Sequence, residues 1–437
     1  MLSTLWKLSA PTVAVMVIQG LVNTAEVYFV GRLGSTALAG ASLCYPMMML
    51  MSAMSGAGLG GGVSSAIARS IGAQDLNKAR SLAIHALALG AAFGLFFTIL
   101  MELVGSHLYE AMGGQGETLA ASVAYSAAFF RGVVVLWIFN TLSSIYRGLG
   151  QPAYPAIVGA AGGLIIVIAS PSLIFGLGPF PAFGIAGAGI AVILYVTAGS
   201  LVLLQRLFSA RSPLRLSFTG FHFETAQFWE ILRVGLPSSV NTAVGTLGFM
   251  VMTGLVGRFG TTALAAFGLG TRFEFILIPV VFGLGTAVIS MVGAAVGAGN
   301  PARAKQVART GALIGAASWG VSGLILAAFP GLWLRIFTTD QQVLKLGYSY
   351  FRIVGPLYSL VGLGMILYFA CQGAGEANIP LFLSLGRLGV ALALGWALVA
   401  FGGSVTAVFA AIATGLAIYG LGLAYATMVV FRRISQK

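Results

Sequence analysis

Three polar side chains share one face of the first apolar segment of the chain, and one of them is a carboxylate. Gln19, Asn23 and Glu26 are spaced i, i+4 and i+7, which places them on one side of a helix. Glu26 lies some five residues before the end of the apolar run 9–31. A carboxyl group screened from water there can exchange a proton near neutral pH. The alternative is a structural hydrogen bond to a neighbouring helix, and we favour proton exchange.

A second carboxylate, Glu274, lies in another apolar run, within the sequence TRFEF. Thr271, three residues earlier, shares its helix face, whereas Arg272 points elsewhere. An ionisable group inside such an apolar run costs free energy, so its presence indicates a function or a partner. We expect Glu274, Thr271 and Arg272 in a substrate cavity, with Glu274 as counter-ion for a cationic ligand or as a second proton site. The alternative is a charge pair between Glu274 and an arginine such as Arg272 or Arg352.

Two further stretches have the composition of a ligand-facing surface. Ser238, Asn241 and Thr242 fall on roughly one face of a helix. Met51 and Met54 belong to a run of methionines, whose flexible side chains suit varied apolar ligands. The structural alternatives are interhelical hydrogen bonding for the polar stripe and packing for the methionines. We include all five among the expected substrate-cavity residues.

Enzyme chemistry and metal binding have little support in the sequence. The motifs HExxH, GxSxG and Walker A do not occur, and the histidines His85, His107 and His222 are scattered. Cys44 and Cys371 both lie inside apolar runs, which excludes a disulfide scaffold or a CxxC metal site. We therefore expect no enzymatic activity, no catalytic residue, no metal and no cofactor. Without a nucleotide-binding motif, transport would be driven by an ion gradient.

Composition indicates the elements that position these side chains. Of 437 residues, 58% are hydrophobic and 8% are charged, and the mean hydropathy is +0.98. A soluble chain carries roughly 25% charged residues, so most of this surface must face lipid. The net charge of +13 would suggest nucleic acid in a soluble protein. In a membrane protein such an excess is typical of cytoplasmic loops.

The hydropathy pattern predicts an all-α integral membrane protein. A transmembrane helix needs about 20 mainly apolar residues, and the chain contains twelve such segments. They fall near 9–31, 36–68, 80–105, 118–146, 153–177, 185–207, 228–257, 262–296, 306–335, 342–371, 379–401 and 406–431.

Basic residues predict the orientation of these spans. With a cytoplasmic N-terminus, the inner segments hold sixteen basic residues and the outer segments four. The positive-inside rule then places both termini in the cytoplasm, in the inner or plasma membrane of a cell. The sixteen are Lys7, Arg69, Lys78, Arg80, Arg147, Arg206, Arg211, Arg215, Arg233, Arg303, Lys305, Arg309, Arg387, Arg432, Arg433 and Lys437.

The sequence repeats itself. VGRLGSTALAG at 30–40 matches VGRFGTTALAA at 256–266 in eight of eleven positions. At an offset of 225, GAQDLNKAR at 72–80 meets GAGNPARAK at 297–305, where Asp75 or Asn300 can cap the next helix.

Each half has six spans, so both halves enter the membrane in the same direction. They should be related by a pseudo-two-fold axis along the membrane normal, with the transport pathway between them. We divide the chain into a six-helix lobe at 1–208, a cytoplasmic linker at 209–227 and a second six-helix lobe at 228–437.

These duplicated motifs, VGRxGxxALA and GAxxxxxA[KR], resemble those of the multidrug and toxic compound extrusion (MATE) family. The stretch 352–375 is similar to that family's tenth span, and RFE in the eighth span resembles its DNA-damage-inducible (DinF-like) branch. The resemblance implies a secondary antiporter that expels cationic or amphipathic compounds in exchange for protons or Na⁺. It also implies two lobes that form a V and open alternately to either side.

The chain departs from the family pattern at its cation site. The family's usual Asp late in the first span is matched by Glu26, and its fourth-span Asn is retained as Asn140. The fifth-span motif positions hold Ile166 and Ser170, and the sixth-span Thr position holds Val192. Because Na⁺ needs several hard oxygen ligands, these departures favour protons, with Glu26 as carrier and Gln19, Asn23, Asn140 and Ser170 around it. Na⁺ coupling is the less favoured alternative.

Other functions compete with drug export. A flippase for lipid-linked precursors, from the same superfamily, predicts a cavity rich in Arg and Lys, whereas only three arginines lie within the spans. A membrane-embedded enzyme lacks a catalytic constellation, and a channel or receptor suits the duplication less well than alternating access. The expected partners are small amphipathic or cationic molecules and the lipid bilayer, with no nucleic acid and no obligate protein partner.

Overall fold

The chain is helical throughout its described residues. The computed structural model describes residues 2–210, 212–217 and 221–436, and each regular element in them is a helix. Arg211 and Lys437 of the basic-residue count, and positions 218–220 of the expected linker, lie outside the described residues.

The first half of the chain begins with a long helix and contains a π-helical turn. Its elements are α1 (Leu2–Gly31), α2 (Ser35–Ala53), the π-helix η1 (Met54–Leu59), α3 (Gly60–Gly72), α4 (Leu76–Ala111), α5 (Gly116–Phe130), α6 (Val133–Gly148), α7 (Ala153–Phe175) and α8 (Ile185–Phe208).

The second half follows a similar order, with one continuous helix in place of α2, η1 and α3, one additional short helix, and a 3-10 turn at the position of the break between α5 and α6. Its elements are α9 (Thr225–Gly257), α10 (Thr261–Gly297), α11 (Pro301–Ala328), α12 (Gly331–Leu334), α13 (Gln341–Val354), the 3-10 turn η2 (Gly355–Leu357), α14 (Tyr358–Gly373), α15 (Asn378–Ala400) and α16 (Val405–Ser435).

The expected spans are present. Within the described residues, eleven helical segments are long and apolar enough to cross a membrane, and a twelfth is obtained when α5 and α6 count as one bent span. These two helices meet at an angle of 48° around Arg131 and Gly132. The equivalent place in the second half, at an offset of 225, is the turn η2. The prediction of an all-α membrane protein with twelve spans is confirmed.

The duplicated loop motif starts a helix in each half. Asp75 accepts a hydrogen bond from the Lys78 backbone N–H at 2.9 Å, and Asn300 accepts one from the Arg303 N–H at 2.9 Å. Both side chains therefore satisfy an otherwise unpaired donor in the first turn of α4 or α11. The predicted helix caps are confirmed.

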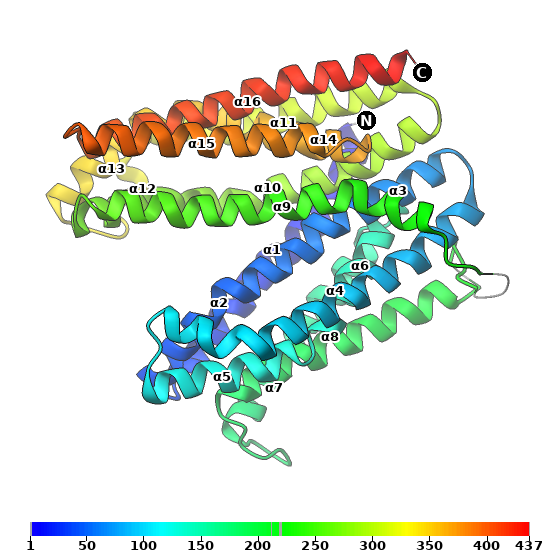
Figure 1. Cartoon of the computed structure of the whole chain (residues 1–437), viewed down its shortest axis with the longest axis horizontal. Helices are drawn as coiled ribbons and strands as arrows, with labels where there is room; N and C mark the ends of the chain where they lie inside the picture. Colours follow the sequence, from blue (N-terminus) through cyan, green and yellow to red (C-terminus); the bar gives the residue numbers. More distant parts are fainter. Residues whose placement is uncertain (1, 211, 218–220, 437) are drawn as a thin grey trace.

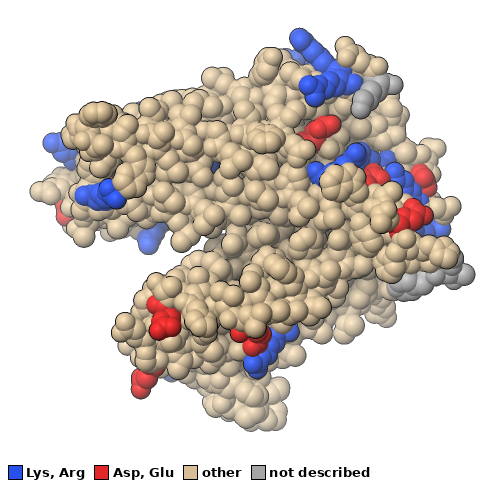
Figure 2. Space-filling view, viewed as in Figure 1, with Lys and Arg blue, Asp and Glu red and all other residues tan. Residues whose placement is uncertain are grey.

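The two halves form the arms of a V (Figure 1). Both termini lie toward the end where the arms meet, called here the closed end, which contains Gly72 and Gly297. The arms separate toward the open end, which contains the turns at Gly34 and Gly260. Figure 2 shows the cleft between the arms, with largely uncharged visible walls, and Lys and Arg side chains around the closed end as well as toward the far ends of the arms.

Glycines allow the arms to touch at the closed end. A Cβ added at Gly72 would collide with the Ala294 carbonyl oxygen, and one added at Gly297 would collide with the Arg69 carbonyl oxygen. These two contacts are related by the offset of 225. The helices α3 and α10 therefore cross at backbone distance, on the pseudo-two-fold axis.

Each arm has its own apolar core, and the first helix of each arm reaches into the other. Leu5 of α1 is buried in the core of the second arm, and Ile231 of α9 is buried in the core of the first. Leu5 and Ile231 are separated by 226 residues, the offset of the repeat. This reciprocal packing joins the lobes at the closed end.

The connection between the arms packs against α4. The Arg80 Nε donates to the Leu214 carbonyl oxygen at 2.5 Å, and the Glu224 N–H donates to His85 Nε2 at 2.9 Å. The Phe221 and Phe223 rings lie 5.1 and 5.5 Å from the His85 ring. In its described residues the connection contains no helix between α8 and α9.

One of the sixteen basic residues that we assigned to cytoplasmic segments lies elsewhere. Arg387 was assigned to a cytoplasmic segment, but it lies in the interior of α15. Its guanidinium stands 5.0 Å from the centre of the Tyr419 ring. A cation over an aromatic face is a favourable arrangement inside a protein, and Arg387 is therefore a residue of the second lobe's interior.

Candidate functional site

Glu26 lies in α1, where it faces Ser170 of α7. The two side chains are close enough to interact, yet neither Glu26 Oε1 nor Ser170 Oγ has a hydrogen-bond partner among the described residues. Ser170 is completely buried. Buried polar atoms are normally paired, so an unpaired carboxyl oxygen beside an unpaired hydroxyl marks a place where a proton or a small ligand can bind.

The other expected coupling residues lie at different distances from Glu26. The Asn23 amide donates to the Tyr45 hydroxyl at 3.2 Å, and Gln19 is exposed on the same helix. The Asn140 amide donates to Ser55 Oγ at 2.7 Å, in the π-helix η1. Of the expected coupling residues, Ser170 therefore lies beside Glu26, and Gln19 and Asn23 lie on the same helix as Glu26. Asn140 contacts Ser55 instead.

Glu274 of α10 is held by two tyrosines of the second lobe. The Tyr350 and Tyr358 hydroxyl groups donate to its Oε1 at 2.6 and 3.0 Å. The expected pair with Arg272 or Arg352 is absent among the described residues, because both arginines are exposed and neither forms an ion pair with Glu274. Tyrosine hydroxyls take the place that the arginines were expected to fill.

The remaining cavity candidates divide between buried and accessible positions. Thr271 is buried and donates to the Phe267 carbonyl oxygen at 3.1 Å. Ser238 is completely buried and accepts a hydrogen bond from Gln372 Nε2 at 2.6 Å. Met51 is also buried, with 3% of its surface exposed. These three serve packing and interhelical bonding in this conformation.

Three candidates are partly accessible. Thr242 donates to the Ser238 carbonyl oxygen at 3.0 Å, along its own helix. Asn241 is half-buried, and its Oδ1 has no hydrogen-bond partner among the described residues. Met54 is half-buried in η1. Asn241 Oδ1 is itself buried, and the Asn241 side chain lies close enough to Tyr368 of α14 to interact, so it faces the interior of the second lobe.

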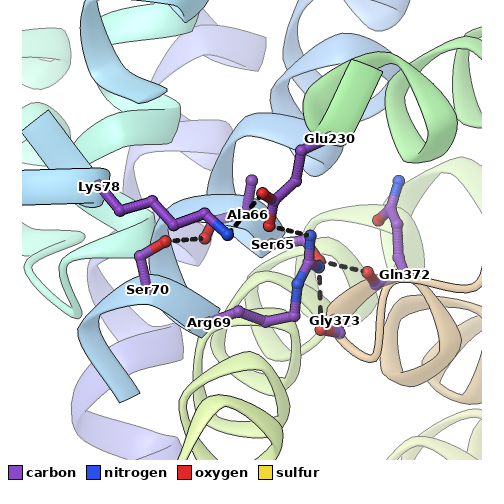
Figure 3. Close-up of polar contacts among 8 residues, drawn as sticks. All are labelled: Ser65, Ala66, Arg69, Ser70, Lys78, Glu230, Gln372 and Gly373. Atoms are coloured by element: carbon purple, nitrogen blue, oxygen red, sulfur yellow. Dashed lines mark hydrogen bonds and ion pairs between the residues drawn. The ribbon is translucent and has the colours of Figure 1, made fainter. Parts of the chain in front are cut away.

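The lobes are joined at the closed end by ion pairs that sequence reasoning missed (Figure 3). Glu230 of α9 lies 3.4 Å from Arg69 Nη2 and 2.8 Å from Lys78 Nζ. Arg69, buried in α3, also donates to the hydroxyl of Ser65. One carboxylate of the second lobe thus bridges two cations of the first. The charges are 161 and 152 residues apart in the chain, and no local spacing pattern links them.

A pair of serines makes matching contacts across the lobes. Ser65 donates to the carbonyl oxygens of Gln372 and Gly373 at 2.6 and 3.1 Å. Ser290 donates to the Arg147 carbonyl oxygen at 2.6 Å. Ser65 and Ser290, like Arg147 and Gln372, are related by the offset of 225. The repeat therefore contained the signal for these contacts, which close the V symmetrically.

The described residues contain no group of three or more His, Cys, Asp or Glu side chains that could hold a metal ion. The Arg131–Glu102 pair, with 2.7 Å between Nε and Oε1, has exposed side chains and lies at the bend between α5 and α6.

Comparison with curated proteins finds transporters. The chain is 27% identical over 377 residues to the FAD transporter of Shewanella oneidensis, which covers 86% of this chain and 83% of that protein. It is 26% identical over 380 residues to "Probable multidrug resistance protein NorM" of Thermotoga maritima (86% and 81% covered). It is 22% identical over 363 residues to the "Multidrug export protein MepA" of Staphylococcus aureus (83% and 78% covered).

Solved structures and a family model give the same result. A MATE protein in the bent conformation superimposes with a TM-score of 0.91 at 26% identity, covering 99% of this chain and 97% of that one. A MOP superfamily transporter from Pyrococcus furiosus gives a TM-score of 0.89 at 26% identity, covering 99% and 96%. The sequence model of the MatE family matches residues 11–171 and again 237–397. The chain therefore belongs to the multidrug and toxic compound extrusion family of membrane transporters.

Proposed function

We propose that the chain is a secondary active antiporter that exports cationic or amphipathic compounds in exchange for protons. Support comes from the multidrug transporters to which it is similar and from the cleft between two duplicated lobes. In alternating access the contacts of the closed end break while the open end closes. The serine contacts and the Glu230 ion pairs are the interactions that this movement must exchange.

The observation that carries proton coupling is the unpaired oxygen of Glu26 beside Ser170. An ionised carboxylate in a span is costly, and protonation or a cationic partner removes that cost. Ile166 and Val192, at the positions where the family's cation ligands are expected, have no side-chain oxygen. A Na⁺ ion would therefore find too few hard ligands here, and protons are the coupling ion that this site suits best.

The orientation of the molecule follows from its basic residues. Sixteen basic residues belong to the segments that we expect on the inside and four to those expected on the outside, and the positive-inside rule then assigns the closed end to the cytoplasm. We therefore place the protein in the cell membrane with both termini cytoplasmic and the cleft open to the outside. Substrate release to the outside would take place from this conformation.

The substrate panel follows from the relatives. Two of the proteins compared above are named for multidrug resistance or export and one for FAD. Cationic dyes are therefore the first substrates to test, followed by a flavin nucleotide. A flippase for lipid-linked precursors is the alternative from the same superfamily. It predicts strong binding of pyrophosphate lipids and no dye export.

Dye export from proteoliposomes tests the proposal. The wild-type protein and the variant Glu26→Gln are compared, first under a pH gradient without Na⁺ and then under a Na⁺ gradient at fixed pH. Export that follows the pH gradient in the wild type and fails in Glu26→Gln supports the proposal. Glu102→Gln is the matched control, because this carboxylate is exposed and paired with Arg131. Normal pH-driven export by Glu26→Gln, or export by the wild type that follows Na⁺ alone, would contradict the proposal.

A further inference from the structure

Arg147 is a cation between the lobes that has no counter-ion among the described residues. It occupies the last turn of α6, and its Nη2 donates to the Gly56 carbonyl oxygen at 3.1 Å and to Ser144 Oγ at 2.6 Å. Both acceptors are uncharged, and no ion pair of the described residues includes Arg147. A guanidinium remains protonated in proteins, and an unpaired charge away from water is unfavourable. The charge therefore calls for an explanation.

The internal repeat shows that this charge is unnecessary for holding the lobes together. Gln372 occupies the equivalent position at an offset of 225. The backbone carbonyl oxygens of Arg147 and Gln372 accept matching serine hydrogen bonds across the lobes. The Gln372 amide also donates to the Ala57 carbonyl oxygen at 3.2 Å. A neutral side chain is therefore sufficient at this structural position.

Arg147 lies beside a small cavity between the lobes. Its Nε and Nη1 have no acceptor among the described residues, and Arg147 lines the cavity itself. Glycines of η1 and α3 form one wall, and Phe282 and Phe369 form part of the other. The two phenylalanine rings meet edge to face, with 5.9 Å between their centres. A cation beside a pair of aromatic rings offers complementary contacts to an acidic group attached to an apolar body.

We propose that Arg147 binds the carboxylate or phosphate group of an amphipathic substrate whose apolar part contacts Phe282 and Phe369. The guanidinium has planar donors that match an oxyanion in a bidentate manner. This inference rests on the proposed transport function and extends its substrates from cations to compounds that carry an acidic group.

The size of the cavity determines when the substrate fits. In this conformation the cavity has room for roughly one water molecule, which is too small for a carboxylate or phosphate group. The cavity lies beside the crossing of α3 and α10, and these helices separate when the closed end opens. The substrate, its acidic group included, is accommodated when the lobes part, so binding belongs to the state that faces the other side of the membrane.

Paired dyes of opposite charge test the proposal in phosphatidylcholine proteoliposomes. Fluorescein is the anionic probe and ethidium the cationic probe, and Arg147→Gln introduces the residue found at the equivalent position of the second lobe. Loss of a charge-assisted bidentate contact lowers kcat/KM for fluorescein by about tenfold or more. The value for ethidium changes by less than about twofold, within the range of an uncharged contact. Arg147→Lys keeps the charge without the planar donors and retains part of the fluorescein export.

Several results would overturn the proposal. An equal loss for both dyes in Arg147→Gln would assign Arg147 a structural role, and unchanged fluorescein export would remove it from the site. Wild-type protein that exports ethidium but never fluorescein contradicts this inference alone, whereas export of neither dye contradicts the proposed transport function. Glu102→Gln is the control for general effects of a lost charge.

A binding measurement with the wild-type protein separates a substrate from a lipid and does not depend on a folded variant. Benzoate and inorganic phosphate should raise the Tm of the protein in phosphatidylcholine, and benzoate should compete with fluorescein export. If only phosphatidylglycerol raises the Tm, Arg147 binds a lipid headgroup and the proposal is wrong.

Discussion

Glu26 and Glu274 are carboxylates within spans of opposite lobes, and their surroundings differ. Glu274 Oε1 accepts hydrogen bonds from two tyrosines, at 2.6 and 3.0 Å. Glu26 Oε1 has no hydrogen-bond partner among the described residues, and neither has the hydroxyl of Ser170 beside it. Donors stabilise an ionised carboxylate and fix its position, so Glu274 is held in one arrangement while Glu26 is available for exchange.

This contrast separates two functions that the sequence alone could not separate. A group that carries a proton must bind and release it during each cycle, and a network of fixed donors opposes that change. Glu26 therefore suits coupling. Glu274 suits either the packing of the second lobe or the recognition of a cationic substrate.

The largest difference is expected between Glu26→Gln and Glu274→Gln in pH-driven dye export. Loss of an essential proton-exchanging group lowers rates by roughly 100-fold or more, which we expect for Glu26→Gln. The amide oxygen of Glu274→Gln still accepts the tyrosine hydrogen bonds, so its rate should fall by less than about tenfold. Initial rates in proteoliposomes measure both. A greater loss for Glu274→Gln would reverse the assignment.

The next effect concerns the stability of the second lobe. Tyr350→Phe combined with Tyr358→Phe removes both donors to Glu274, and hydrogen bonds to a charged group contribute about 1.5–3 kcal/mol each. We expect the double variant to be destabilised by about 3 kcal/mol, measured as a lower Tm in detergent. Tyr425→Phe, at a site with 69% exposure, is the control. An unchanged Tm in the double variant would show that Glu274 is not held by these tyrosines.

A smaller effect on stability is expected at the partner of Glu26. Ser170 Oγ makes no hydrogen bond with the described residues, so Ser170→Ala should change the free energy of unfolding by less than about 1 kcal/mol. Export at a given pH gradient should still fall, because the hydroxyl lies beside the proposed carrier. Thermal unfolding and export rates are measured on one preparation. A large loss of stability would mean that the hydroxyl is paired after all.

The smallest effect is expected at the exposed Glu102–Arg131 pair. Pairs of this kind contribute about 0–1 kcal/mol, so Glu102→Gln should leave both Tm and export nearly unchanged. The same two assays check this. A marked loss of export would show that loss of an exposed carboxylate also affects transport, and the difference between Glu26 and Glu274 could then not be assigned to their surroundings.

Sequence patterns predicted the architecture well, because the span count and the repeat depend on local hydropathy and on direct comparison of the two halves. The caps at Asp75 and Asn300 are local too. Contacts between distant elements were predicted less well. The tyrosine partners of Glu274 lie 76 and 84 residues away, and the rotation of α13 and α14 that directs them inward depends on the packed lobe.

Contacts between distant elements also explain the other differences between the predicted and the observed positions of residues. Asn140 was grouped with Glu26 because it matches the fourth-span Asn of the family's cation site, but in the structure its amide donates to Ser55 of the π-helix η1. Arg387 was counted with the cytoplasmic segments, and its contact with Tyr419, which lies on another helix, follows from no local pattern. Ser170, in contrast, was placed beside Glu26 by resemblance to a family motif, and the structure shows the two side chains together.

Proton release on substrate binding tests the central claim most directly. Ethidium is added to the purified protein in weakly buffered detergent solution, and released protons are followed with a pH indicator. If Glu26 exchanges its proton for the substrate, the wild type releases up to about one proton per bound ethidium. Glu26→Gln then binds ethidium without proton release, and Glu274→Gln releases protons as the wild type does. Undiminished proton release from Glu26→Gln would contradict the account.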